Sequence, residues 1–223
     1  MKPIQAVLFD LDGVLADSEP LWNEIDTALL AEYGVIYGGE HKHQVLGKSF
    51  PLALAFYKDT FKLRQEVEEM ALRRTAIAAD FYATRIPIFP DAASVLQALR
   101  AMPLKIGLAT SSVGELIKPF LARHDIMRFF HEIVTGEEVQ RGKPHPDIYL
   151  RAAAKVGIAP EYCLVVEDAL SGVQAATSAG MTVVAIPDPR FVDTRQYEGK
   201  TDYLLSHVGE LPNFVKTHFQ VSG

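Results

Sequence analysis

Short apolar runs alternate with helix-length segments along most of the chain, and this alternation constrains the fold more than any other feature. Strands are expected at 6–9, 104–109, 132–135, 163–166 and 182–186, with an edge strand at 203–205. Helices are expected between them at 114–123, 147–156 and 172–179, with one capped by Asp91 and a closing one at 208–217. The central runs lack polar alternation, which indicates strands covered on both faces. Strands joined by helices of this length predict an α/β fold with a doubly wound parallel sheet.

A segment from about residue 18 to residue 86 interrupts this pattern. It contains helical patterns at 20–33, 51–57 and 66–82 and no convincing strand, and a proline-bounded stretch at 86–90 follows it. We therefore expect two domains. The first is a core made of residues 1–17 and 87–223, and the second is an all-helical insert of residues 18–86.

Polar residues follow several of the expected strands. Asp10 and Asp12 come after the first strand, Thr110 and Ser111 after the second, and Glu167 and Asp168 after a third, while Lys143 lies in a loop just before a helix. Residues past the carboxyl ends of parallel strands line a common crevice, so we expect these groups to converge. Two carboxylates as close as Asp10 and Asp12 repel each other unless a cation or a proton lies between them. Each of these elements has an ordinary explanation when taken alone, as a turn, a helix cap or a surface lysine. These explanations do not account for the order in which the elements occur together.

The composition excludes several classes of function. The net charge is −6 with mixed signs along the chain, so neither a nucleic-acid partner nor a membrane surface is expected. Cys163 is the only cysteine, which rules out an internal disulfide and fits a reducing compartment. No apolar run is long enough to span a bilayer, and the N-terminus begins with a strand instead of a leader. We expect a cytoplasmic monomer that acts on a small molecule.

The order of these motifs resembles the haloacid dehalogenase superfamily of phosphotransferases, and the resemblance covers almost the whole chain. Its four motifs are matched in order by Asp10–Val14, Thr110–Ser111, Lys143–Pro144 and Glu167–Asp168. The helical insert resembles the cap domain of the branch that includes beta-phosphoglucomutase and small sugar-phosphate phosphatases. The stretch 17–22 is similar to the hexitol- and deoxysugar-phosphate phosphatases of that branch. The resemblance implies a Rossmann-like core with an inserted helical cap.

The resemblance also implies a role for each motif residue. Asp10 is the expected nucleophile, which forms an aspartyl-phosphate, and Asp12 is the expected general acid and then base. Mg²⁺ is the expected cofactor, because it prefers oxygen ligands and pairs with carboxylates and phosphate. Its expected ligands are Asp10, the Asp12 main-chain carbonyl and Asp168, with Glu167 at or next to the ion. Ser111, Ser112 and Lys143 are expected to hold the phosphoryl oxygens.

The helical insert is expected to act as a lid that excludes water and contacts the leaving group. The candidate contacts are Glu19, Trp22, Asn23, Gly47 and Lys48, next to Leu46. Trp22 has a second interpretation, which is packing inside the insert. Lys48 either binds a second anionic group or is solvated.

Two positions favour a hydrolase over a mutase. The beta-phosphoglucomutase pattern has a histidine twelve residues after the nucleophile and an arginine three residues after the cap glycine, and this chain has Trp22 and Phe50 there. Because a mutase must bind a phosphate at both ends of its sugar, the missing arginine counts against it. We therefore expect a phosphatase acting on a small phosphorylated metabolite. A sugar phosphate is the leading substrate, followed by a nucleoside or flavin-precursor phosphate. A phosphomutase and a non-catalytic binding protein stay as alternatives.

Overall fold

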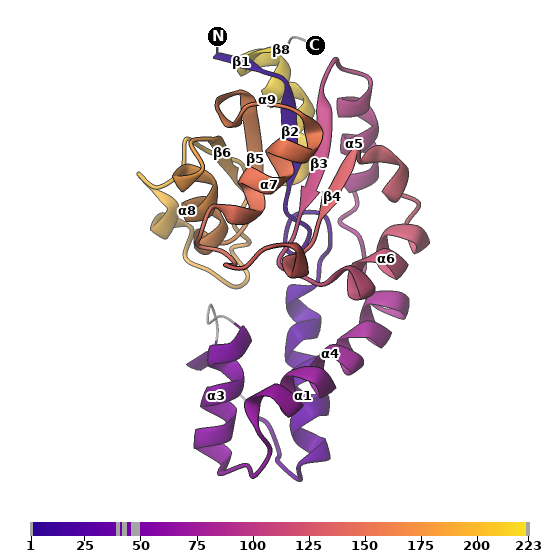
Figure 1. Ribbon diagram of the computed structural model, residues 1–223, viewed down its shortest axis with the longest axis vertical. Helices are drawn as coiled ribbons and strands as arrows, with labels where there is room; N and C mark the ends of the chain where they lie inside the picture. Colours follow the sequence, from indigo (N-terminus) through magenta and orange to yellow (C-terminus); the bar gives the residue numbers. More distant parts are fainter. Residues whose placement is uncertain (1, 39–40, 42–43, 46–49, 222–223) are drawn as a thin grey trace. The chain divides into compact units, whose positions relative to one another are not determined.

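The computed structural model describes residues 2–38, 41, 44–45 and 50–221 (Figure 1). The chain forms two compact units. One unit contains Met1–Asp17 and Pro87–Gly223, and the other contains Ser18–Ile86. The first unit is an α/β core and the second is helical, so the helices and strands of each are described separately.

The core contains a six-stranded sheet in which all strands are parallel, as predicted. The strand order is β4 (Glu132–Val134), β3 (Lys105–Ala109), β2 (Ala6–Phe9), β5 (Cys163–Glu167), β6 (Thr182–Ala185) and β7 (Tyr203–Leu204). Every residue of β2 and β5 is buried, which explains why both strands are apolar without polar alternation. Phe9 pairs with Leu108 on β3 and with Val166 on β5, so these three strands end at the same edge.

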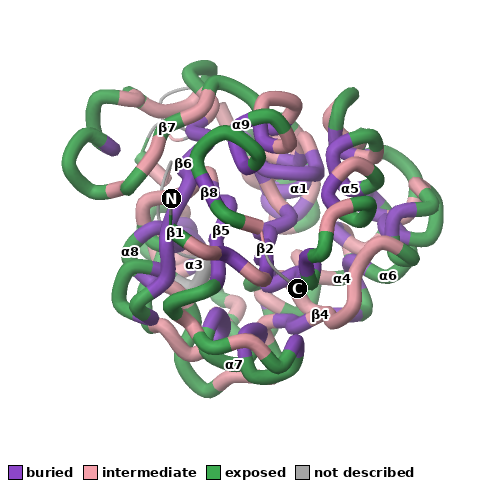
Figure 2. The backbone as a smooth tube through the Cα atoms, turned by 90° about the horizontal axis from the view of Figure 1, so that it is seen from above, coloured by how far each residue is buried: buried purple, intermediate pink, exposed green. Residues whose placement is uncertain are grey.

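Helices cover both faces of the sheet (Figure 2). One face packs against α7 (Asp147–Val156) and α8 (Leu170–Ser178), and the opposite side carries α5 (Ala92–Arg100) and α9 (Leu211–His218). The remaining core helix is α6 (Gly114–Arg123), and short 3-10 turns cover 127–129, 136–138, 160–162, 194–197 and 208–210. Helix α7 buries five residues at helical spacing: Ile148, Tyr149, Ala152, Ala153 and Val156. It ends at Gly157, whose φ of 73° is the left-handed conformation that glycine adopts most easily.

Three details of the core differ from the sequence prediction. Strands β1 (Lys2–Ile4) and β8 (Phe219–Val221) form a separate parallel pair that was not predicted, because three residues are too few to show a pattern. The closing helix was predicted from residue 208, but Val208–Glu210 is a 3-10 turn and α9 follows it. Asp91 precedes α5 but makes no side-chain cap, because its own backbone is helical (φ −90°, ψ −9°) instead of extended.

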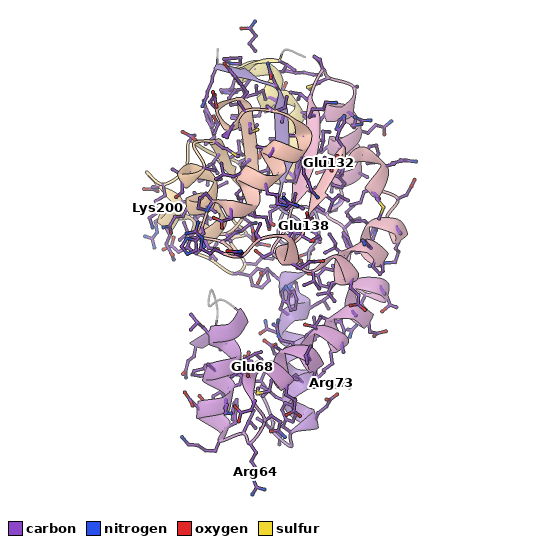
Figure 3. The ribbon with its side chains drawn as sticks, viewed as in Figure 1. Arg64, Glu68, Arg73, Glu132, Glu138 and Lys200 are labelled. Carbon is purple, nitrogen blue, oxygen red and sulfur yellow. The ribbon has the colours of Figure 1, made fainter. Side chains whose placement is uncertain are left out.

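The second unit includes α1 (Glu19–Glu32), α3 (Phe50–Phe61) and α4 (Val67–Thr84), as the helical patterns predicted. Its core includes Leu29, Leu30, Leu54, Tyr57 and Met70. Buried Asp26 accepts hydrogen bonds from the Tyr57 hydroxyl (2.7 Å) and from Arg74 Nε (2.5 Å). Charged side chains of α4 such as Glu68 and Arg73 are exposed (Figure 3). Within the described part of the chain, no helix has the length and hydropathy needed to cross a membrane.

Candidate active site

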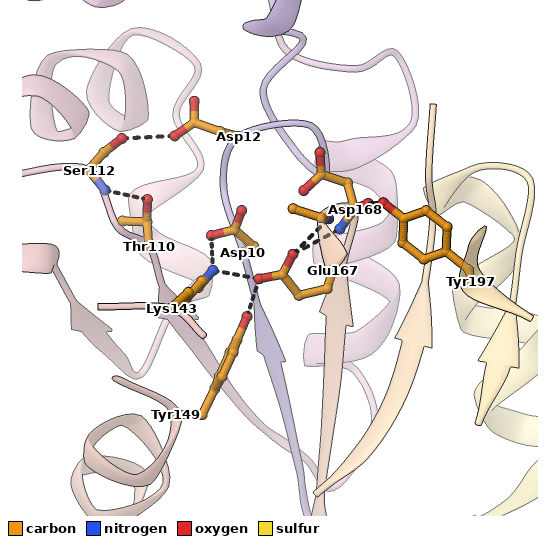
Figure 4. Close-up of polar contacts among 10 residues, drawn as sticks. Asp10, Asp12, Thr110, Ser112, Lys143, Tyr149, Glu167, Asp168 and Tyr197 are labelled. Carbon is orange, nitrogen blue, oxygen red and sulfur yellow. Dashed lines mark hydrogen bonds and ion pairs between the residues drawn. The ribbon is translucent and has the colours of Figure 1, made fainter. Parts of the chain in front are cut away.

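Three buried polar residues lie at the carboxyl edge of the sheet, where β2, β3 and β5 end together (Figure 4). They are Asp10, Thr110 and Glu167, with exposed fractions of 7%, 1% and 0%. Asp10 follows β2, and its N–H donates to Val166 O of β5 at 3.0 Å. The backbone ladder therefore continues one residue past the strand and fixes the position of this carboxylate.

Lys143 joins two of these carboxylates, although it lies more than a hundred residues from Asp10 in the sequence. Its Nζ donates to Asp10 Oδ1 at 2.8 Å and to Glu167 Oε1 at 2.5 Å. The lysine side chain is only 7% exposed. An ion pair between Arg141 and Asp147 (2.9 Å) ties the start of this loop to the first turn of α7. The structure therefore brings one buried cation between two buried acids.

Glu167 is held by four donors from this chain. Its Oε1 accepts from Lys143 Nζ and from the Tyr149 hydroxyl, the latter at 2.6 Å. Its Oε2 accepts from the N–H groups of Asp168 (3.0 Å) and Ala169 (3.1 Å). Gly172 lies against the same carboxylate, since a Cβ there would be 1.7 Å from Oε1. The side chain of Glu167 is therefore fixed from every side.

The electrostatics of the site favour a bound cation. Burial raises the pKa of Asp10 from 3.8 to about 7, against the opposing effect of Lys143, and Glu167 and Asp12 raise it further. Burial lowers the pKa of Lys143, but Asp10 and Glu167 outweigh that effect and raise it overall. Burial followed by the charge of Glu167 raises the pKa of Tyr149 well above its ordinary value, so the hydroxyl stays protonated and donates. One lysine therefore does not balance the buried acids.

Asp10, Glu167 and Asp168 form a group that fits a divalent cation. One oxygen from each lies within 4.8 Å of the others. The Tyr197 hydroxyl donates to Asp168 O at 2.5 Å and holds the backbone at this point. Gly13, with φ of +76°, lets the turn after β2 approach Asp168, because a Cβ there would be 2.0 Å from Asp168 Oδ2. A set of carboxylate oxygens of this kind matches the ligand preference of Mg²⁺.

Asp12 and the loop after β3 are joined by Ser112. The Ser112 hydroxyl donates to Asp12 Oδ2 at 2.9 Å, and the Ser112 N–H donates to Thr110 Oγ1 at 3.1 Å. Ser111, which stands between Thr110 and Ser112 in the sequence, is exposed. Of the predicted hydroxyl residues, buried Thr110 therefore lies closest to the strand end, and Ser112 contacts a carboxylate.

The turn that follows β4 supports the loop after β3. Gly136 N–H donates to Ser112 O at 3.1 Å, and Glu137 Oε1 accepts from Gly114 N–H at 2.9 Å. A Cβ on Gly136 would be 2.2 Å from Ser111 O. Two chain segments are thus packed backbone to backbone, and only glycine fits at the contact.

The predicted contacts in the insert belong to the helical unit. Glu19, Trp22 and Asn23 are half-buried on α1. The Trp22 ring lies edge-on to Tyr82 (5.9 Å between centroids) and 4.4 Å below the Arg74 guanidinium carbon. These contacts agree with the packing interpretation of Trp22. Gly47 and Lys48 lie outside the described residues, and the role of all five residues in binding stays a prediction.

Sequence reasoning missed Tyr149, Gly136 and Gly172 at this site. Tyr149 lies on the buried face of α7, and a buried tyrosine needs a partner for its hydroxyl, but the sequence does not show which distant residue provides it. The two glycines carried no local signal, because the atoms they accommodate come from segments distant in the sequence.

The fold and the site together define the class of protein. It is a parallel α/β core with an inserted helical unit, and its site at the strand ends contains several acids and one lysine. The family model described as haloacid dehalogenase-like hydrolase matches residues 7–186, which include all four predicted motifs. The chain belongs to this family, and the predicted α/β fold with a helical cap region is confirmed.

Comparison with individual proteins gives the same family. A Drosophila melanogaster protein named probable pseudouridine-5′-phosphatase is 34% identical over 226 residues, which cover 98% of this chain and 95% of that protein. Hexitol phosphatase B of Escherichia coli K12 is 30% identical over 202 residues, which cover 86% and 90%. A solved beta-phosphoglucomutase from Clostridium difficile is 23% identical with a TM-score of 0.73 and 96% coverage of both chains. This last likeness shows the fold alone, so the fold does not separate hydrolase from mutase.

Proposed function

We propose that the protein is a Mg²⁺-dependent phosphatase that hydrolyses a small phosphomonoester through an aspartyl-phosphate on Asp10. The observation that supports this most strongly is the buried arrangement of Asp10, Lys143 and Glu167 next to Asp168. The two relatives named above by sequence are phosphatases. An acidic site of this composition suits attack on a phosphoryl group, where charge must be neutralised.

In this proposal Asp10 attacks phosphorus and Lys143 neutralises charge on the phosphoryl oxygens. Lys143 already contacts Asp10 Oδ1, so its ammonium lies beside the attacking carboxylate. Asp12 protonates the leaving alkoxide and then accepts a proton from the attacking water. The hydrogen bond from Ser112 to Asp12 Oδ2 limits the orientation of that carboxylate. Thr110, with Ser111 and Ser112, supplies hydroxyl and backbone donors at the end of β3.

Asp10, Asp168 and the Asp12 main-chain carbonyl would hold Mg²⁺, with Glu167 beside them. When bound, the ion supplies positive charge that keeps Asp10 ionised at neutral pH and offsets its repulsion of the phosphate. That contribution is needed because burial, together with the charges of Glu167 and Asp12, raises the pKa of Asp10 to about 7 even with Lys143 beside it.

A sugar phosphate is the leading substrate, and the hexitol phosphatase among the relatives supports it. A nucleoside phosphate is second, because another relative is named for pseudouridine phosphate. The helical unit would act as the lid, with Glu19, Trp22 and Asn23 as candidate contacts to the leaving group. A phosphomutase is the alternative that the shared fold keeps open, although Trp22 and Phe50 replace the histidine and arginine of the mutase pattern.

A metabolite panel tests the proposal. Phosphate release is measured from hexitol phosphates, deoxyhexose phosphates, pseudouridine 5′-phosphate, flavin mononucleotide and p-nitrophenyl phosphate, with Mg²⁺ and with a chelator. We expect Mg²⁺-dependent release that the Asp10→Asn variant abolishes. Efficient conversion of glucose 1-phosphate to the 6-phosphate with little free phosphate would favour the mutase. Absence of turnover of every compound with several metals would favour a binding protein. A cytoplasmic location and a monomeric state stay predictions.

A further inference from the structure

We infer that Tyr149 is a positioning residue that acts through Glu167 to aim Lys143 at the phosphoryl site. The inference rests on the proposed phosphatase function and gives a role to Tyr149, which the reaction scheme does not use. The Tyr149 hydroxyl donates to Glu167 Oε1, and the Tyr149 ring lies beside Lys143 Nζ. Because phenylalanine keeps the ring, the effect of the hydroxyl on Lys143 is the part that passes through the Glu167 carboxylate.

The first step of the inference concerns the acceptor capacity of Glu167. A carboxylate has about four lone-pair positions for hydrogen bonds. In Glu167 four donors of this chain occupy them: Lys143 and Tyr149 at Oε1, and two backbone N–H groups at Oε2. To bind a cation directly, Glu167 would have to give up one of these bonds. Glu167 therefore acts as the partner of the lysine, and Asp10 and Asp168 remain the ligands proposed above.

The second step concerns the lysine. Lys143 Nζ is shared between Asp10 Oδ1 at 2.8 Å and Glu167 Oε1 at 2.5 Å, so its position depends on how strongly each oxygen attracts it. The Tyr149 hydroxyl, 2.6 Å from Oε1, shares that oxygen with the lysine. The ring of Tyr149 also lies 5.1 Å from Nζ, within the range of a cation–π contact. Removing the hydroxyl leaves Lys143 as the sole side-chain donor to Oε1 and draws it toward Glu167.

The third step concerns rigidity. Glu167 cannot move away to compensate, because Gly172 lies directly behind its carboxylate and leaves no free volume there. Both carboxylate and tyrosine are fully buried, so no exposed water replaces the lost donor without rearrangement. The change at Tyr149 is therefore transmitted to Lys143 and is not absorbed locally.

Tyr149→Phe tests the inference, with Tyr57→Phe as a matched control. Both tyrosines are fully buried and donate to a buried carboxylate at nearly the same distance, 2.6 Å to Glu167 and 2.7 Å to Asp26. We expect both variants to lose similar thermal stability. In Tyr149→Phe alone, kcat with p-nitrophenyl phosphate should fall about tenfold and the inhibition constant of inorganic phosphate should rise by a similar factor.

Equal kinetic constants for the two variants, with active wild-type protein, would overturn the inference and leave the proposed function intact. An inactive wild type would instead reject the proposed function. Should Tyr149→Phe not fold, Glu167→Gln replaces it, with Mg²⁺ and phosphate affinities measured separately by calorimetry. We expect phosphate affinity to fall about tenfold and Mg²⁺ affinity to change less than about threefold. A large loss of Mg²⁺ affinity with unchanged phosphate affinity would make Glu167 a ligand and reject the inference.

Discussion

Replacing Asp10 by Asn should stabilise the metal-free protein at alkaline pH while it abolishes activity. The folded-state pKa of Asp10 is raised from 3.8 to about 7, first by burial and then by the neighbouring acids Glu167 and Asp12. The charged form is therefore unfavourable in the folded state despite the contact with Lys143. Asparagine has nearly the same shape and no charge to bury, and its amide oxygen still accepts from Lys143.

The sign of the effect follows from proton linkage. Because the folded-state pKa is above the unfolded value, protonated Asp10 contributes its full stability below about pH 4. That contribution is lost as the pH rises toward 7. One pKa unit corresponds to about 1.4 kcal/mol, so the loss at pH 8 amounts to as much as about 4 kcal/mol. Titrating groups away from this site are shared by the two proteins and cancel in the comparison, whereas the pKa of Lys143 depends on the charge of Asp10.

Urea unfolding in the presence of a chelator, followed by far-ultraviolet circular dichroism, measures this difference. Near pH 4.5 the difference between the two proteins should be only about 1 kcal/mol. The variant should become more stable than the wild type by about 2–4 kcal/mol at pH 8. Excess Mg²⁺ should narrow the gap, because it stabilises only the protein that keeps the carboxylate. If the difference in free energy of unfolding does not depend on pH, or if the variant is less stable at pH 8, the raised pKa of Asp10 is wrong. The argument that the site needs a bound cation then fails as well.

Three further predictions concern the same edge of the sheet. Lys143→Met should lower kcat/KM at least a hundredfold and destabilise the fold by about 3–5 kcal/mol, because it removes the cation that pairs with two buried carboxylates. Phosphate release and urea unfolding measure these effects. Activity within tenfold of wild type would contradict the role of the lysine. Asp168→Asn should weaken Mg²⁺ binding at least tenfold in calorimetry with little change in the metal-free fold, and unchanged affinity would exclude Asp168 as a ligand. Gly136→Ala should lower kcat severalfold, because the added Cβ would be 2.2 Å from Ser111 O and would displace the loop after β3. Gly142→Ala is the control, since a Cβ there has no neighbour within 4 Å. Equal activities of the two variants would show that the loop after β3 tolerates displacement.

The sheet and its strand ends could be predicted because their determinants are local. The apolar runs at β2 and β5 have no polar alternation, which is typical of a strand covered on both faces. Once the strands are parallel, the residues that follow them must meet at one edge, so Asp10 and Glu167 could be placed together. Lys143 was harder to place, because its loop precedes a helix and does not follow a strand.

The supporting residues could not be predicted because their determinants are distant in sequence. Gly172 accommodates the Glu167 carboxylate, and Gly136 accommodates Ser111 O, but neither glycine differs locally from one at an ordinary turn or helix. Tyr149 is one of five buried residues on α7, and the periodic pattern does not distinguish its hydroxyl from an apolar neighbour. The capping of α5 by Asp91 failed for a related reason, since a capping side chain requires an extended backbone that residue type alone does not ensure.

Chemical trapping of the enzyme during turnover tests the covalent route most directly. The enzyme is mixed with its best substrate and Mg²⁺ and quenched with borohydride, which reduces an acyl phosphate to an alcohol, and the peptides are then examined by mass spectrometry. We predict homoserine at position 10, dependent on both substrate and Mg²⁺. Rapid turnover that leaves position 10 unmodified, or reduction at Asp12 or Asp168 instead, would contradict Asp10 as the nucleophile.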